Sequence, residues 1–169
     1  MERWVVLHWA HWLDELFVPL SHIGNSGLIW LIVAGVAALY WRRPSIFLFV
    51  VAADVLALSA SWGLRQAIGR ERPPHRFPDP APLVHVPVSD SFPSGHAATS
   101  FACAALLAWL TPLPKVPLFV LAALIAYSRV YVGVHYPLDV LGGAALGLAV
   151  ATALRLLAEA RRRSDPAPQ

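Results

Sequence analysis

Long apolar stretches recur along this chain of 169 residues, and they constrain its fold more than any other feature. A helix needs roughly 20 mostly apolar residues to cross a bilayer, and somewhat fewer where Trp, Tyr or Arg anchors its ends. Four or five segments meet this requirement: residues 27–41, 45–69, 95–110, 116–132 and 138–157. They predict an all-α integral membrane helical bundle. Small residues at 142, 143 and 147 would let its helices approach closely.

The first segment, residues 4–17, has a different pattern. Polar residues recur in it every three to four positions within a Trp-rich apolar sequence: His8, His11, Asp14 and Glu15. This amphipathic pattern favours a helix that lies in the membrane interface over one that spans with its polar stripe turned inward. The bundle then has about five to six helices. The His8/His11 pair has no third metal ligand nearby, so we interpret it as part of the polar face.

Composition excludes several classes of protein. Hydrophobic residues make up 57% of the chain and charged residues 14%, whereas soluble domains average roughly 45–50% and about 25%, so the composition argues against a soluble enzyme. The 13 Lys and Arg are scattered among apolar runs, which argues against a nucleic-acid partner. The single Cys103 permits neither an internal disulfide nor a CxxC site. We see no cleaved signal peptide. The sequence predicts one membrane domain, residues 1–160, and a basic, Pro-rich disordered tail, residues 161–169.

The order of the segments predicts which polar parts share a membrane face. Residues 70–93 form a long polar connection with seven of the 15 prolines. By parity, this loop lies on the same side as the start of the third span and the 131–136 junction. The opposite side holds the cations of the short connections: Arg42, Arg43, Lys115, Arg161, Arg162 and Arg163. Positive charge in short loops marks the cytoplasm, so the polar loop is expected to face outward.

Three groups of chemically active residues converge on that outward face. They are Arg65 and Arg72; Ser94, Gly95 and His96; and Arg129, His135 and Asp139. Arginine binds phosphate oxygens through a planar fork, and three arginines together could neutralise a phosphoryl group. Ser94 and Gly95 introduce a helix whose N-terminal amides favour an anion. Asp139, one helical turn after His135, could hold one ring nitrogen and aim the other at phosphorus.

The pattern R-x6-R-P, P-S-G-H and S-R-x5-H-x3-D resembles the signature of the type-2 phosphatidic acid phosphatase superfamily. That superfamily includes membrane lipid phosphatases, bacterial undecaprenyl-diphosphate phosphatases and soluble vanadium haloperoxidases. The resemblance covers residues 65–139 and fits the small bacterial membrane branch. One departure is Arg65, where the family usually has Lys. This exchange keeps the charge and alters the fine geometry.

The resemblance implies a role for each matched residue. His135 would form a phosphohistidine, Asp139 would orient it, and His96 would serve as acid and then as base. The phosphate would be bound by Arg65, Arg72, Arg129, Ser94 and Gly95. The resemblance implies that the phosphatase chemistry is independent of metal, and we expect no cofactor. The implied partner is a lipid phosphate in the bacterial inner membrane, with the active site facing the periplasm or exterior.

Several alternatives remain open at this point. The resemblance ranks undecaprenyl diphosphate first as substrate, ahead of phosphatidylglycerol phosphate or phosphatidate and of lipid A 1-phosphate. A phosphate-group transferase would use the same phosphohistidine, and a small transporter or assembly subunit would use none. Asp54, in mid-span, is interpreted as a buried hydrogen-bond partner in preference to a catalytic group. Four loop residues are either headgroup contacts or solvated: His75, Arg76, His85 and Asp90. The oligomeric state is left open.

Overall fold

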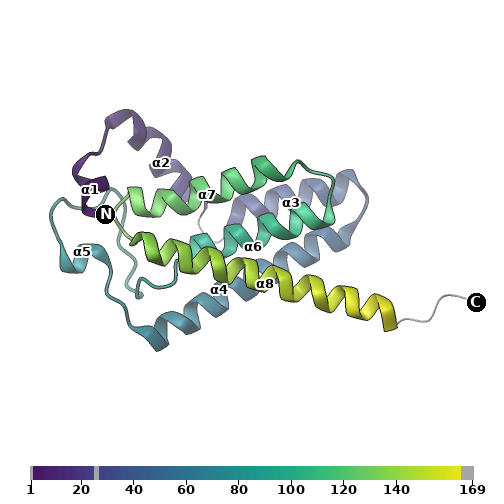
Figure 1. Cartoon of the computed structure of the whole chain (residues 1–169). Helices are drawn as coiled ribbons and strands as arrows, with labels where there is room; N and C mark the ends of the chain where they lie inside the picture. The colour runs from purple at the N-terminus through teal and green to yellow at the C-terminus, as the bar shows by residue number, and fades with distance from the viewer. Residues whose placement is uncertain (1, 25–26, 165–169) are drawn as a thin grey trace, which may run out of the picture.

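The computed structural model describes residues 2–24 and 27–164, and in these ranges the regular elements are all helices. Figure 1 shows them as a bundle of roughly antiparallel rods: α1 (Glu2–Leu7), α2 (His11–Ile23), α3 (Leu28–Tyr40), α4 (Pro44–Ile68), α5 (Pro73–Arg76), α6 (Gly95–Leu110), α7 (Lys115–Tyr131) and α8 (Pro137–Ser164). The five apolar segments of the sequence correspond to α3, α4, α6, α7 and α8. The predicted all-α bundle is therefore confirmed.

The long apolar helices of the bundle surround a shorter, buried helix, α6. The chain from Pro44 to Arg76 and helix α8 are each long and apolar enough to cross a membrane, and α2 with α3 adds a third crossing if the pair is one broken span. Helix α6 has only 16 residues, yet it contacts α4, α7 and α8. Most of its side chains are buried. It is therefore the central helix of the bundle.

Small residues bring α8 against α6. A Cβ atom on Gly143 would collide with the carbonyl oxygen of Ser94, and one on Gly147 would collide with that of Ala98. Close backbone approach of this kind is how membrane helices gain packing energy without a hydrophobic driving force. It also fixes the start of α8 beside the start of α6, where the Ser94 amide donates to the Asp139 carbonyl oxygen at 2.9 Å.

The N-terminal amphipathic segment differs from its prediction as one helix over residues 4–17. Residues 8–10 separate α1 from α2, and α2 continues to Ile23. Helix α2 packs on α7, with the buried Phe17 ring 4.7 Å from that of Tyr131. The Tyr131 hydroxyl donates to Asp14 at 2.7 Å, which anchors the polar stripe to the bundle.

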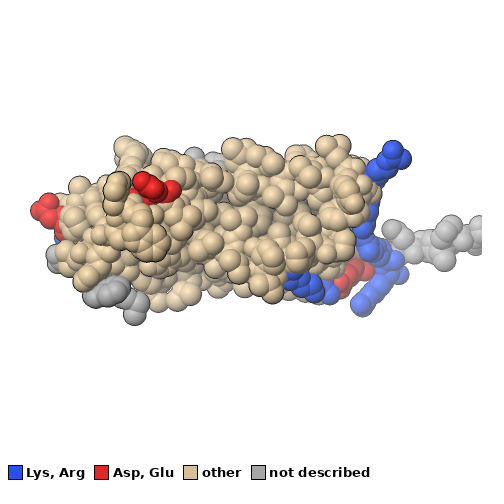
Figure 2. Space-filling view, turned by 90° about the horizontal axis from the view of Figure 1, so that it is seen from above, with Lys and Arg blue, Asp and Glu red and all other residues tan. Residues whose placement is uncertain are grey.

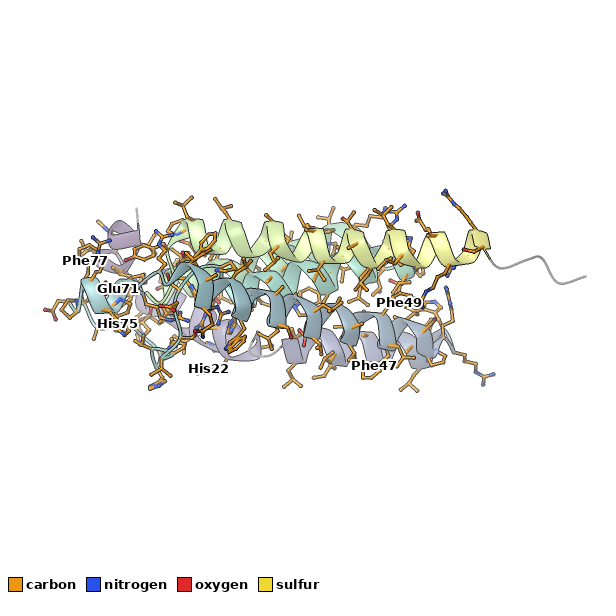
Figure 3. The ribbon with its side chains drawn as sticks, turned by 90° about the horizontal axis from the view of Figure 1, so that it is seen from below. His22, Phe47, Phe49, Glu71, His75 and Phe77 are labelled. Carbon is orange, nitrogen blue, oxygen red and sulfur yellow. The ribbon has the colours of Figure 1, made fainter. Side chains whose placement is uncertain are left out.

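The two ends of the bundle differ in charge and structure. Lys and Arg side chains gather at the end where α8 finishes (Figure 2). Figure 3 shows Glu71, His75 and Phe77 at the other end, where the 70–93 loop lies. Phe47 and Phe49 point from α4 nearer the cationic end. Helix α8 continues to Ser164, so residues 161–164 of the predicted disordered tail are helical, and residues 165–169 lie outside the described residues.

Candidate active site

The three sequence clusters meet around one cavity of about 170 Å³ at the end of the bundle that carries the 70–93 loop. Its wall is built from α4, the loop, α6, α7 and the α7–α8 link: Leu58, Arg65, Arg72, Pro87, Ser89, Gly95, His96, Thr99, Arg129 and His135. Six of the eight residues selected from the sequence therefore line the cavity directly. Asp139 lies behind His135, and Ser94 is the residue that precedes α6.

The environment of His135 fixes its tautomer. The Nδ1 atom lies 3.4 Å from Asp139 Oδ2, and the Nε2 atom lies 3.1 Å from Arg72 Nη1. A carboxylate only accepts hydrogen bonds and a guanidinium only donates them. Nδ1 therefore carries the proton, and Nε2 presents its lone pair on the side of the arginines. A neutral imidazole with Nε2 unprotonated is the form that can act as a nucleophile.

Burial also keeps this imidazole neutral. His135 is 2% exposed, and desolvation lowers its pKa to about 3, assisted by the nearby cations of Arg72 and Arg129 and opposed by Asp139. The ring is consequently uncharged throughout the neutral range.

The lowered pKa of His135 makes stability depend on pH. In the unfolded chain His135 binds a proton near its ordinary value of about 6.5, so between that pH and about 3 the unfolded state holds more protons. Stability is therefore lost as the pH falls through this window. We expect the thermal unfolding midpoint in detergent to fall more for the wild type than for His135→Gln as the pH is lowered. Equal falls in the two proteins would contradict this assignment.

Arg72 connects the 70–93 loop to the link between α7 and α8. Its guanidinium is 2% exposed and donates to the carbonyl oxygens of Ser89, Asp90 and Val134 at 2.6, 3.1 and 3.0 Å. Two of these acceptors belong to the 70–93 loop and the third belongs to the residue before His135. Arg72 therefore holds the loop at a fixed distance from His135. A lysine ammonium has no planar fork with which to do this.

Arg65 and Gly95 fit together sterically. Arg65 reaches from the last turns of α4, where Nε donates to the Pro93 carbonyl oxygen at 3.0 Å. A Cβ atom on Gly95 would collide with Arg65 Nη2. Glycine is thus required for the guanidinium to lie across the start of α6, where helix amides favour an anion.

Arg129 and His96 share a partner that the sequence did not reveal. Ser21, on α2, is 2% exposed; its hydroxyl accepts from Arg129 Nη1, and its carbonyl oxygen lies 3.2 Å from His96 Nε2. A carbonyl only accepts, so His96 Nε2 carries a proton and Nδ1 is left for exchange with a ligand. Nothing in the pattern around Ser21 distinguishes it from an ordinary helix serine.

Two other contributors were also missed. Ser89 lines the cavity, and its hydroxyl accepts from Arg72 Nη2 at 3.2 Å. Arg70 Nη1 contacts Asp139 Oδ1 at 2.9 Å. Its position between the two motif arginines, Arg65 and Arg72, was a signal that sequence reasoning could have used.

Two buried polar atoms at the site have no partner among the described residues: Ser94 Oγ and Arg129 Nε. Buried polar groups are rarely left unpaired unless a ligand or water satisfies them. Both belong to residues expected from the sequence to bind phosphate.

The remaining candidates lie away from the cavity wall. Asp54 is buried in α4 and faces Gly27, and its Oδ1 has no hydrogen-bond partner among the described residues. Residues 25–26, which precede Gly27, lie outside those residues, so its role as a buried hydrogen-bond partner stays a prediction. Loop residues His75, Arg76 and His85 are exposed. Within residues 2–24 and 27–164 no group of three or more His, Cys, Asp or Glu is arranged to hold a metal ion.

Comparisons with known proteins agree with this geometry. The PAP2 superfamily matches residues 43–163. The decaprenylphosphoryl-5-phosphoribose phosphatase of Mycolicibacterium smegmatis is 41% identical over 126 residues, covering 73% of this chain and 67% of that protein. The undecaprenyl-diphosphatase of Sulfolobus acidocaldarius is 34% identical over 137 residues, covering 80% and 66%. The crystal structure of the transmembrane PAP2-type phosphatidylglycerolphosphate phosphatase from Bacillus subtilis superimposes with a TM-score of 0.77 at 28% identity, covering 97% of this chain and 85% of that one.

The chain therefore belongs to the PAP2 superfamily. It is an integral membrane lipid phosphatase of that superfamily, as the resemblance in its three motifs implied.

Proposed function

We propose that this phosphatase removes a terminal phosphate from a polyprenyl-linked lipid through a phosphohistidine at His135, without a metal ion. The observation that carries the proposal is the single cavity on which Arg65, Arg72 and Arg129 converge with a neutral histidine that a carboxylate orients. Cations fixed around developing negative charge stabilise the transition state of phosphoryl transfer.

The proposed reaction has two displacements. The His135 Nε2 lone pair attacks phosphorus while the phosphorus–oxygen bond to the lipid breaks. The leaving oxygen takes the Nδ1 proton of His96, which enters this step as the imidazolium and leaves it neutral, with Nε2–H still donated to the Ser21 carbonyl oxygen. Water then attacks the phosphohistidine, His96 accepts the water's proton, and the phosphorus–nitrogen bond breaks. Asp139 holds the Nδ1 proton throughout, which stabilises the positive charge that develops on the ring.

Similarity supports the choice of a polyprenyl lipid. Undecaprenyl diphosphate was the first candidate from sequence, and relatives are named for that diphosphate and for a decaprenylphosphoryl phosphoribose. These two substrates share a polyprenyl chain and a terminal phosphate. The cavity of about 170 Å³ admits a phosphate group and not a whole headgroup, so discrimination between lipids is assigned to the 70–93 loop.

Phosphate release from four lipids tests the proposal: undecaprenyl diphosphate, decaprenylphosphoryl-5-phosphoribose, phosphatidylglycerol phosphate and lipid A. We expect release from a polyprenyl lipid to be fastest, to survive EDTA and to be lost in His135→Ala. Preference for either of the other lipids would reject the substrate class, and loss in EDTA would reject metal independence. An alcohol acceptor in the same assay would reveal a transferase, because the phosphate would then appear on the alcohol.

The role of His96 predicts a dependence on the leaving group. His96→Ala should slow hydrolysis of a lipid phosphate monoester far more than that of nitrophenyl phosphate, because the nitrophenolate leaves without a proton. Initial rates with the two substrates measure the difference. Equal losses would count against His96 as the general acid.

The charge distribution supports a site that faces outward. The cationic end carries Arg42, Arg43, Lys115 and Arg161–Arg163, and positive charge in short connections is retained in the cytoplasm. A cysteine at Ala81, an exposed position of the loop, should therefore react with an impermeant thiol reagent in intact bacterial cells. The natural Cys103 is buried and gives little background. Labelling only after lysis would reverse the orientation.

A further inference from the structure

Arg70 is a cation at the site that the reaction above does not use. It follows Gly69, the left-handed residue with φ 63° that ends α4. Its Nη1 donates to Asp139 Oδ1 at 2.9 Å, and the Arg70 side chain is 34% exposed while that of Asp139 is fully buried. The ion pair thus joins the buried carboxylate to a partly exposed guanidinium that is not part of the cavity wall.

The remaining contacts of Asp139 show what this ion pair controls. Asp139 Oδ2 accepts from the Tyr136 amide at 2.8 Å and lies 3.4 Å from His135 Nδ1. The contact with the histidine is the longest of the three. The orientation of the carboxylate is therefore set by Arg70 on one oxygen and by the Tyr136 amide on the other.

Arg70 is itself held in place. Its guanidinium carbon lies 4.3 Å from the centre of the Tyr136 ring, a cation–π distance. Its carbonyl oxygen accepts from the Ser91 amide at 2.8 Å, which joins the two ends of the loop. The guanidinium is thus fixed between Tyr136 and Asp139.

We propose that Arg70 is a positioning residue for the phosphoryl-transfer reaction: it holds the Asp139 carboxylate in the rotation that orients His135. The proposal rests on the proposed function, because Arg70 acts only through the Asp139–His135 pair. It predicts that loss of Arg70 slows the chemical step and leaves phosphate binding, which belongs to the other three arginines, nearly unchanged.

The outer side of Arg70 is accessible. It lines a surface groove of about 530 Å³ together with Arg76, Phe77, Tyr136, Pro137, Leu138 and Leu141. A small cation from solution can therefore reach the space that the Arg70 side chain would vacate. Arg72, at 2% exposure, offers no such access.

Chemical rescue of Arg70→Ala tests the proposal in detergent-solubilised full-length protein. We expect kcat to fall by on the order of tenfold to a hundredfold, with KM within about twofold, because a displaced catalytic group costs rate and not binding. Millimolar guanidinium chloride, well below denaturing concentrations, should restore much of the lost kcat, whereas equal NaCl should not. Arg70→Lys should retain more activity than Arg70→Ala, since it keeps the cation.

Two matched variants make the test specific. Arg161→Ala removes an exposed arginine at the opposite end of the bundle and should leave kcat unchanged. In an Asp139→Asn background, Arg70→Ala should cause little further loss, because its target is already gone. An unchanged kcat in Arg70→Ala, a change in KM alone, or full additivity with Asp139→Asn would overturn the proposal.

The proposed function can fail separately. If His135→Ala keeps wild-type turnover, the phosphohistidine mechanism is wrong whatever Arg70 does. If His135→Ala is inactive and Arg70→Ala is fully active, only the role of Arg70 is wrong.

Discussion

Replacing His135 by Ala is expected to reduce turnover of lipid phosphate by several orders of magnitude, since it removes the atom that forms the covalent bond. Phosphate release by purified protein, followed over hours so that slow rates are measurable, gives the magnitude.

The effect of His135→Ala must be separated from misfolding. His135→Gln, which is nearer in size to the buried ring, serves as the second variant and should be equally inactive. Both proteins should elute from size exclusion as the wild type does. Retention of more than about a tenth of wild-type turnover by either folded variant would contradict nucleophilic catalysis by His135.

Replacing Arg72 by Ala is expected to lower both activity and stability. The carbonyl oxygens of Ser89, Asp90 and Val134 would lose their donor. The bond to Val134 is buried, and a buried acceptor left unpaired costs about 1–3 kcal/mol. The loop would also separate from the residue before His135. We expect kcat/KM to fall by about 10² or more, the scale of losing one fixed donor to a transition state, together with a lower thermal unfolding midpoint.

Arg72→Lys is the matched control for this prediction. It keeps the charge and loses the fork, so it should recover little of the stability and only part of the rate. Arg161→Ala, at an exposed position of the opposite end of the bundle, should change neither quantity. An unfolding midpoint equal to that of the wild type in Arg72→Ala would contradict the role of Arg72 in joining the 70–93 loop to the α7–α8 link.

Local sequence features sufficed to predict most of the fold. The apolar segments that became α3, α4, α6, α7 and α8 are separated by charged or proline-containing turns, so their limits could be located within a few residues. The break between α1 and α2 was missed because the polar period continues across residues 8–10. Packing on α7, through Phe17, determines where that helix restarts.

The sequence was enough to predict which residues line the candidate site, but not the contacts that they make with one another. Chemistry-bearing residues such as Arg129 and His135 stand out in an apolar chain because ionisable groups near lipid are costly. Contacts between residues far apart in the chain produce no pattern in the local sequence. The hydroxyl of Ser21 reaches Arg129 across 108 positions, and Arg70 reaches Asp139 across 69, only because the helices pack as they do.

Trapping the covalent intermediate tests the phosphohistidine mechanism most directly. Substrate labelled with ³²P in its terminal phosphate would be mixed with His96→Ala, which should break down the phosphoenzyme slowly, and the reaction would be quenched in alkali. The mechanism predicts label on the protein that is stable to alkali, released by acid and located on His135. Turnover without any labelled protein, or label on another residue in folded, active enzyme, would contradict it.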